Sequence, residues 1–180
     1  MTSVPAVMDI EASGLGRGNY PIEVGYVLSD GRSACYLIRP EPEWTFWNDD
    51  AQRLHGISPE LLQRHGRAAG DVARLLNSAL AGLTLYSDAW GNDYSWLSLL
   101  FEHADLVPRF RLQPLQLLLS DSQKRLWNDM RAQVCVDLDL SRHRASSDAR
   151  ILQETYLRTL MAVGDVAPLL PHAEPSASRN

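Results

Sequence analysis

Two acidic residues, Asp9 and Glu11, lie two positions apart at the end of an apolar run near the start of the chain. If residues 4–11 form a strand, both side chains project from the same face, because successive side chains of a strand point to opposite faces. Two carboxylates at such a short distance repel each other, and a hard divalent cation between them usually removes this repulsion. The simpler alternative is an exposed strand end with two solvated acids, so a catalytic interpretation needs partners elsewhere in the chain.

Three such partners follow, and each also has a simpler explanation. Asp93 comes at the expected start of a helix, where an Asp can serve as the N-cap. His143 lies in an expected loop, where a histidine is more often a surface or capping residue. Asp148 falls in the first turn of the expected last helix, where the helix dipole alone favours an acid. Asp88 is the alternative to Asp93 in the same loop.

Together these residues could hydrolyse a phosphodiester bond. That reaction needs a reactive water near neutral pH and charge stabilisation on the attacking and leaving oxygens, which two divalent cations supply. The four carboxylates of Asp9, Glu11, Asp93 and Asp148 suit two Mg²⁺ or Mn²⁺ ions. A histidine at position 143 can accept the proton of the attacking water as a general base.

The pattern of apolar residues predicts an α/β domain that would position these groups. The Asp30-Gly31 turn predicts a hairpin between the second and third strands, and helical spacing with capping residues marks the helices. Strands are expected at 4–11, 22–28, 33–39, 83–86 and 110–112, and helices at 48–54, from 58, at 71–80, at 93–104, over most of 114–134, and through Met161. Three N-terminal strands, two of them in a hairpin, predict a mixed sheet.

Composition is that of an ordinary globular protein. The chain has 180 residues, of which 45% are hydrophobic and 22% charged, and no apolar run approaches the length of a bilayer span. Residues 1–163 are expected to form one domain and 164–180 a disordered tail. The start of the chain lacks the basic segment that is typical of a signal peptide, so we expect a cytoplasmic protein without membrane partners. In that reducing compartment Cys35 and Cys135 are expected to be free thiols in or near the core. The net charge of −5 argues against extended duplex binding and favours short substrates.

The order and setting of these residues resemble the DnaQ-like 3'-to-5' exonucleases, the DEDD group, in its subclass with a histidine (DEDDh). The first motif matches as Asp9-Ile10-Glu11 followed by Ser13-Gly14-Leu15, the third as His143-x-Ala145-x-x-Asp148-Ala149, and the segment 54–62 looks like a turn that the family carries between its first two motifs. The second motif departs from the family, because the usual Asn, aromatic residue and Asp are replaced by the run Asp88-Ala89-Trp90-Gly91-Asn92-Asp93.

The resemblance implies an RNase H-like fold, with a five-stranded mixed sheet flanked by helices on both faces. It implies that Asp9, Glu11 and Asp148 hold the ions, that Asp93 completes the second site, and that His143 is the general base. The same resemblance implies that Ala12, Ser13, Gly14 and Leu15 bind the 3' end of single-stranded RNA or DNA. Small exoribonucleases and oligoribonuclease-like members are the most similar in size, which favours RNA or short oligonucleotides, and a homodimer is compatible with them.

Two alternatives stay open from the sequence. One is a catalytically silent module of the same fold that binds nucleic-acid ends. The other is a different acid-dependent phosphohydrolase, such as a haloacid dehalogenase, although the second acid here is Glu11 where that family has Asp.

Overall fold

The computed structural model describes residues 4–140 and 142–164, which form a five-stranded mixed sheet with strand order β3-β2-β1-β4-β5. β1 pairs antiparallel with β2 and parallel with β4, β2 pairs antiparallel with β3, and β4 pairs parallel with β5. The strands are β1 Ala6–Ala12, β2 Pro21–Val27, β3 Ser33–Leu37, β4 Thr84–Ser87 and β5 Arg111–Pro114. The predicted hairpin and the mixed sheet are confirmed.

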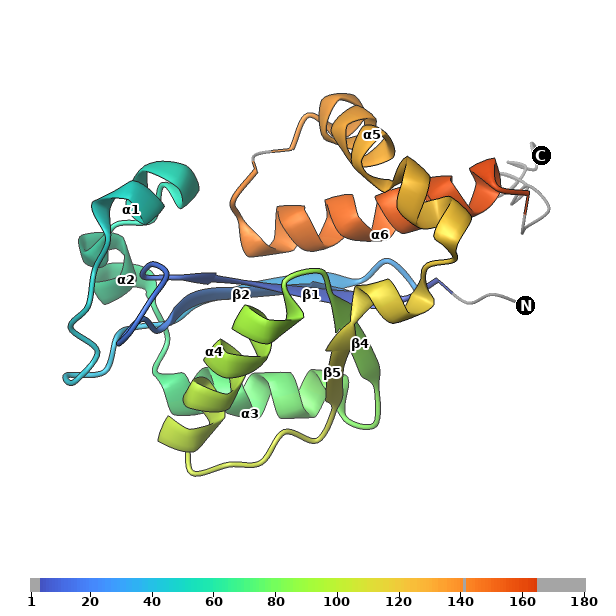
Figure 1. The fold of residues 1–180 in the computed structure, drawn as a ribbon. Helices are drawn as coiled ribbons and strands as arrows, with labels where there is room; N and C mark the ends of the chain where they lie inside the picture. The colour runs from blue at the N-terminus through green and yellow to red at the C-terminus, as the bar shows by residue number, and fades with distance from the viewer. Residues whose placement is uncertain (1–3, 141, 165–180) are drawn as a thin grey trace, which may run out of the picture.

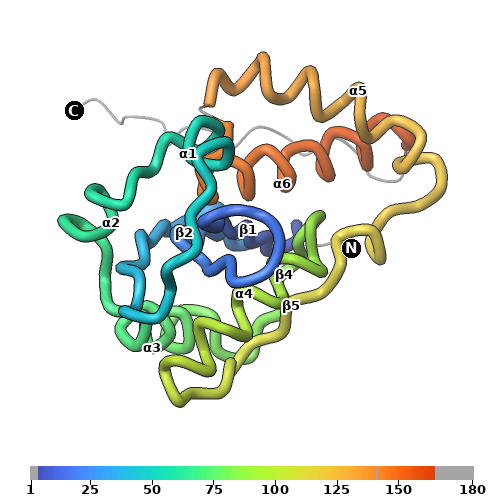
Figure 2. The backbone as a smooth tube through the Cα atoms, turned by 60° about the vertical axis from the view of Figure 1, so that its left-hand side comes forward, coloured from blue at the N-terminus to red at the C-terminus, as the bar shows by residue number. Residues whose placement is uncertain are grey.

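Helices cover both faces of this sheet (Figures 1 and 2), as predicted. α5 and α6 lie on one face, and α3 and α4 lie on the other. The helices are α1 Asp49–His55, α2 Pro59–His65, α3 Ala69–Leu80, α4 Trp90–His103, α5 Asp121–Leu138 and α6 Ala145–Ala162, and a short 3₁₀ turn spans Leu115–Leu118. None of the helices in these described ranges is long and apolar enough to cross a membrane.

β1 separates two hydrophobic layers. Met8 and Ile10 point into the larger core with α3 and α4, whereas Val7 packs in a smaller cluster with Ala149 and Leu152 of α6. Asp9 and Glu11 alternate with Met8 and Ile10, so they share the face of the sheet that α6 covers. The strand therefore presents both carboxylates to the helix whose N-terminal segment carries the third motif.

The first two helices begin and end as their sequences predict. The Asn48 side chain accepts hydrogen bonds from the first backbone N–H groups of α1, and Ser58 does the same for α2 with Pro59 at its first position. Gly56 ends α1 in the left-handed conformation, with φ of 68°, which a glycine adopts without strain. These caps fix the turn at 54–62 beside the end of β1.

Three expectations about local structure were wrong. α4 begins at Trp90 rather than at Asp93, so Asp93 is not an N-cap; Ala89 precedes the helix. The segment 114–134 is split by Ser120, whose capping box with Gln123 starts α5, and that helix continues to Leu138. Cys35 is exposed on the edge strand β3 rather than in or near the core, while Cys135 is partly buried. Except for Gly164, the predicted tail, 164–180, lies outside the described residues.

Candidate metal and active site

The end of β1 and the start of α6 bring three of the candidate residues together. Glu11, His143 and Asp148 each offer one ligand atom, and these atoms lie within 4.8 Å of one another. Glu11 comes from the strand, His143 from the loop that precedes α6, and Asp148 from the first turn of that helix. Residues more than 130 positions apart in the chain thus form one cluster of oxygen and nitrogen donors.

Backbone conformation and a hydrogen bond hold the loop of His143 in place. His143 adopts a positive φ of 60°, which is uncommon for a residue other than glycine. Its backbone N–H donates to Oδ2 of Asp148 at 2.9 Å. Oδ1 of Asp148 is buried and has no hydrogen-bond partner among the described residues. One oxygen of Asp148 therefore shapes the loop, while the other is left for a ligand.

Asp93 lies in the first turn of α4 and is 1% exposed. Its Oδ2 accepts a hydrogen bond from the hydroxyl of Ser87 at the end of β4. Its Oδ1 is buried without a partner within the described ranges. The charges of Asp93 and Asp9 interact, as do those of Asp93 and Glu11, so Asp93 lies beside the first motif.

Asp88, the alternative to Asp93, has a different partner. Its Oδ2 accepts from Nη1 of Arg131 on α5 at 2.9 Å, and both side chains are partly exposed. Asp88 still contributes to the negative potential at Asp9 and Asp93. Asp88 already has a cationic partner, whereas Asp93 has a buried oxygen without a partner among the described residues, so the geometry favours Asp93 over Asp88 as a candidate ligand.

Burial and mutual repulsion make this cluster costly to ionise. Burial, followed by the charges of Asp93, Glu11 and Asp148, raises the pKa of Asp9 well above its usual value. Burial and the Asp148 carboxylate raise the pKa of Glu11 to about 7, and burial raises that of Asp93 to about 7 despite the hydrogen bond from Ser87. Burial also raises the pKa of Asp148.

These observations fit a site for divalent cations. Oδ1 of Asp93 and Oδ1 of Asp148 are buried acceptors without partners in the described part of the chain, and a buried acceptor of this kind is rare unless a ligand or ion completes it. A cation would also remove the repulsion that raises the pKa values of Asp9 and Glu11. Carboxylate oxygens are the donors that Mg²⁺ and Mn²⁺ prefer.

A cavity of about 300 Å³ adjoins this cluster and shares Glu11 and His143 with it. Ala12, Gly14 and Leu15 line the cavity, as do residues of α1 and its turn, including Leu54 and His55. Leu15 and Leu54 are 70% and 63% exposed, which leaves apolar side chains at the mouth of a polar site. Ser13 differs from its neighbours: its side chain is fully buried, and its hydroxyl accepts from the backbone N–H of Tyr20. The Ser13 hydroxyl is therefore engaged in holding the loop.

Two residues of this region carried no functional prediction from the sequence. His55 is the last residue of α1, and Glu23 is an acid among the apolar residues of β2. In the structure β2 is buried along its whole length because α6 covers its second face, and Glu23 is 0% exposed. The signal in the sequence was an acid between apolar residues in a strand, which becomes informative only when both faces of that strand are covered.

Comparisons with models of protein families and with curated proteins found no match. Solved structures do match. The zinc-bound complex of Escherichia coli exonuclease I with single-stranded DNA is 14% identical with a TM-score of 0.61, over 90% of this chain and 41% of that one. A moderately thermophilic exonuclease I from Methylocaldum szegediense is 11% identical with a TM-score of 0.61, over 87% of this chain and 40% of that one.

The chain therefore spans about two fifths of the length of these proteins. At this identity the likeness establishes the fold, which is the RNase H-like fold of exonuclease I, and the predicted fold class is confirmed.

Proposed function

We propose that this chain is a metal-dependent 3'-to-5' exonuclease of the DEDDh type, which hydrolyses phosphodiester bonds from the 3' end of single-stranded nucleic acid. The observation that carries the proposal is the cluster of Glu11, His143 and Asp148, whose ligand atoms lie within 4.8 Å of one another. The exonuclease I structures with the same fold include complexes with single-stranded DNA oligonucleotides. The acidic net charge of −5 favours short oligonucleotides, RNA among them, over long tracts.

In this proposal Asp9, Glu11, Asp93 and Asp148 hold two Mg²⁺ or Mn²⁺ ions. When bound, the ions would supply charge stabilisation at the attacking and leaving oxygens of the phosphodiester. The chain's own residues then have distinct tasks. Asp148 orients the loop of His143 through its Oδ2, and the His143 imidazole accepts the proton of the attacking water.

The cavity beside the cluster would take the terminal nucleotide, with Leu15 and Leu54 against the base or sugar. His55 offers it a donor. Nδ1 of His55 accepts from the backbone N–H of Ile57 at 3.0 Å, so the neutral ring carries its proton on Nε2. That Nε2 is buried without a partner among the described residues, and burial lowers the His55 pKa, which favours the neutral ring. An acceptor oxygen of the nucleotide would satisfy it.

A digestion panel tests this function. Single-stranded RNA and DNA of several lengths, labelled at either end, are incubated with Mg²⁺ or Mn²⁺. A 3'-to-5' exonuclease releases a 3' label at once and shortens a 5'-labelled strand into a ladder. The variant Asp148→Asn, purified in parallel, controls for contaminating nucleases. Binding of oligonucleotides without hydrolysis would instead support the silent end-binding module. The absence of both binding and hydrolysis would contradict both functions.

A further inference from the structure

The loop of His143 is tied to the sheet by a second carboxylate that lies outside the metal cluster. Glu23 lies opposite Glu11 in the antiparallel register of β1 and β2, and its side chain is 0% exposed. Arg144, the residue that follows His143, donates from Nε to both carboxylate oxygens of Glu23 at 3.0 and 3.1 Å and from Nη2 to Oε1 at 2.6 Å. The pair is thus bidentate, the geometry in which arginine binds a carboxylate most specifically.

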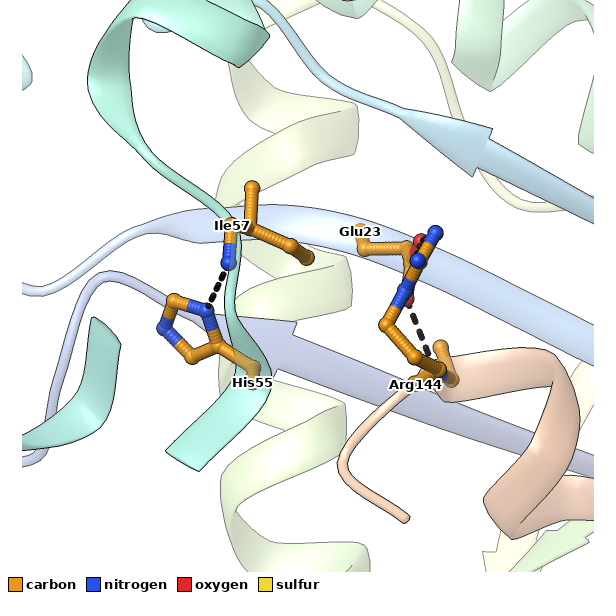
Figure 3. A network of polar contacts seen from close by, with 5 residues as sticks. Glu23, His55, Ile57 and Arg144 are labelled. Atoms are coloured by element: carbon orange, nitrogen blue, oxygen red, sulfur yellow. Dashed lines mark hydrogen bonds and ion pairs between the residues drawn. The ribbon is translucent and has the colours of Figure 1, made fainter. Parts of the chain in front are cut away.

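Glu23 also caps the helix. The backbone N–H of Ala145, the first residue of α6, donates to Oε2 of Glu23 at 2.8 Å. Arg144 occupies the N-cap position and its own side chain makes no capping bond within the described ranges. A carboxylate from β2 therefore replaces the usual capping side chain, in a position where the helix dipole favours a negative charge. Figure 3 shows the Arg144 side chain lying over Glu23 at the start of the helix.

Close packing at the same point leaves the start of α6 little freedom. A Cβ atom on Gly25, two residues after Glu23, would lie 2.2 Å from the backbone nitrogen of Ser146. The backbones of β2 and α6 thus touch, and only a glycine allows this distance. His143 is consequently held from two sides, by Asp148 through its own N–H and by Glu23 through the next two residues.

We propose that Glu23 and Arg144 form a positioning pair that sets the His143 imidazole relative to Glu11 and Asp148. The inference rests on the proposed function. Neither residue contacts the reacting atoms in this assignment; they act by fixing a loop whose left-handed residue would otherwise have other conformations available. Displacing a general base by about 1 Å can lower a rate by roughly 10²-fold, and outer residues that orient site groups typically contribute about 10- to 100-fold.

Two variants with different chemistry test the pair. Glu23→Gln keeps the shape and one acceptor but removes the charge, and Arg144→Lys keeps the charge but removes the planar fork. We expect kcat to fall by about 10- to 100-fold in both, with KM within about threefold of the wild type.

The matched control is Glu154→Gln, which breaks the ion pair between Glu154 and Arg158 on the same helix. That variant should keep the wild-type kcat. If Glu23→Gln fails to fold, Arg144→Lys carries the test, because the Arg144 side chain is 42% exposed.

A double-mutant cycle separates positioning from a general structural role. If the pair acts through His143, then Glu23→Gln should lower the rate of a His143→Ala enzyme by less than about threefold. Independent effects would instead multiply, and that result would overturn the proposal. A wild-type kcat in both Glu23→Gln and Arg144→Lys would overturn it equally.

A readout without catalysis distinguishes this inference from the function on which it rests. In the metal-free protein, the NMR signals of the His143 imidazole should shift or broaden in Glu23→Gln and Arg144→Lys and stay unchanged in Glu154→Gln. An inactive wild type would refute the exonuclease assignment, whereas unchanged imidazole signals in an active enzyme would refute the positioning pair alone.

Discussion

Glu11 and Glu23 face each other across β1 and β2, and they have opposite surroundings. Glu23 is fully buried and accepts four hydrogen bonds from Arg144 and Ala145. Glu11 is partly exposed, lies in the acidic cluster, and its pKa is raised to about 7 by burial and by Asp148. Of these two adjacent acids on the same face of the sheet, Glu23 thus stabilises the fold through its hydrogen bonds, whereas Glu11 is available to bind a ligand.

Asp9→Ala should abolish nuclease activity while leaving the fold intact. The substitution removes a proposed metal ligand and, in the metal-free protein, also removes a carboxyl whose pKa is raised well above its usual value by burial and by the neighbouring carboxylates. The melting temperature without metal should therefore stay the same or rise. The measurements are the digestion rate and thermal unfolding with a chelator, with the exposed acid variant Glu102→Ala as control. Wild-type activity in Asp9→Ala would remove Asp9 from the mechanism.

Asp93→Asn should lower the rate by at least roughly 10²-fold, and Asp88→Asn by no more than a few-fold. Asp93 has a buried free oxygen beside the first motif, whereas Asp88 is paired with Arg131. Both substitutions remove one negative charge without changing the shape of the side chain, so each serves as the control for the other. Single-turnover rates with Mn²⁺ decide the ranking, and the reverse order would transfer the second-motif role to Asp88.

The metal-free protein should lose stability as the pH rises from about 4 to about 7. In the native state the pKa values of Glu11 and Asp93 are raised to about 7, above the unfolded values near 4. The native state therefore binds more protons than the unfolded state in this window, and the free energy of unfolding falls with pH until both groups are ionised. Mg²⁺ or Mn²⁺ should restore it at pH 7.5, because the ions bind the ionised native cluster.

Melting curves between pH 4.5 and 8, with a chelator or with metal, measure this dependence. The variant Asp9→Asn removes a carboxyl whose pKa is raised in the native state, so its metal-free curve should be flatter than that of the wild type. Parallel curves for the two proteins would show that other groups cause the slope and would contradict the electrostatic account of the cluster.

The sequence predicted the element that carries each site residue better than it predicted their surroundings. Period-two alternation placed Asp9 and Glu11 on one face of β1, and the helical spacing of the apolar residues that follow placed Asp148 near the start of a helix. Both are local properties, set by a few neighbouring residues. The contact of Asp148 with Glu11 depends instead on the path of the chain between them, which no local pattern contains.

Asp93 and Glu23 show where local reasoning failed. Asp93 looked like an N-cap because an Asp before an apolar helical pattern usually is one, but the helix begins at Trp90 and the carboxylate points inward. The sequence gives no sign that Glu23 is buried, because a two-residue period does not reveal whether the second face of a strand is covered. In both cases tertiary packing by α6 and β4, rather than propensity, decides the role of the acid.

Gly25→Ala should destabilise the protein by about 1–3 kcal/mol or more, because the added Cβ would lie 2.2 Å from the Ser146 nitrogen and 2.4 Å from the Ala145 carbonyl carbon. Relief of this clash would push the start of α6 away from β2, so activity should fall along with stability.

Gly91→Ala in α4 is the matched control, because a Cβ atom added at Gly91 meets no atom of the described residues within 4 Å. Denaturant unfolding should show that variant within about 1 kcal/mol of the wild type. A Gly25→Ala protein as stable as Gly91→Ala would mean that α6 does not pack on β2 as described.

His143→Ala separates a general base from a metal ligand, the two roles that its position beside Glu11 and Asp148 allows. If the imidazole accepts the proton of the attacking water, the variant should bind Mn²⁺ with nearly wild-type affinity while its turnover falls by roughly 10²- to 10⁴-fold. Higher pH should recover part of the variant's activity, because hydroxide needs no general base. Calorimetric Mn²⁺ titration, thermal unfolding and pH–rate profiles measure these effects, with His65→Ala at the exposed end of α2 as control. A collapse of Mn²⁺ affinity in His143→Ala would make His143 a ligand, and a neutral-pH rate within a few-fold of wild type would end its assignment as the base.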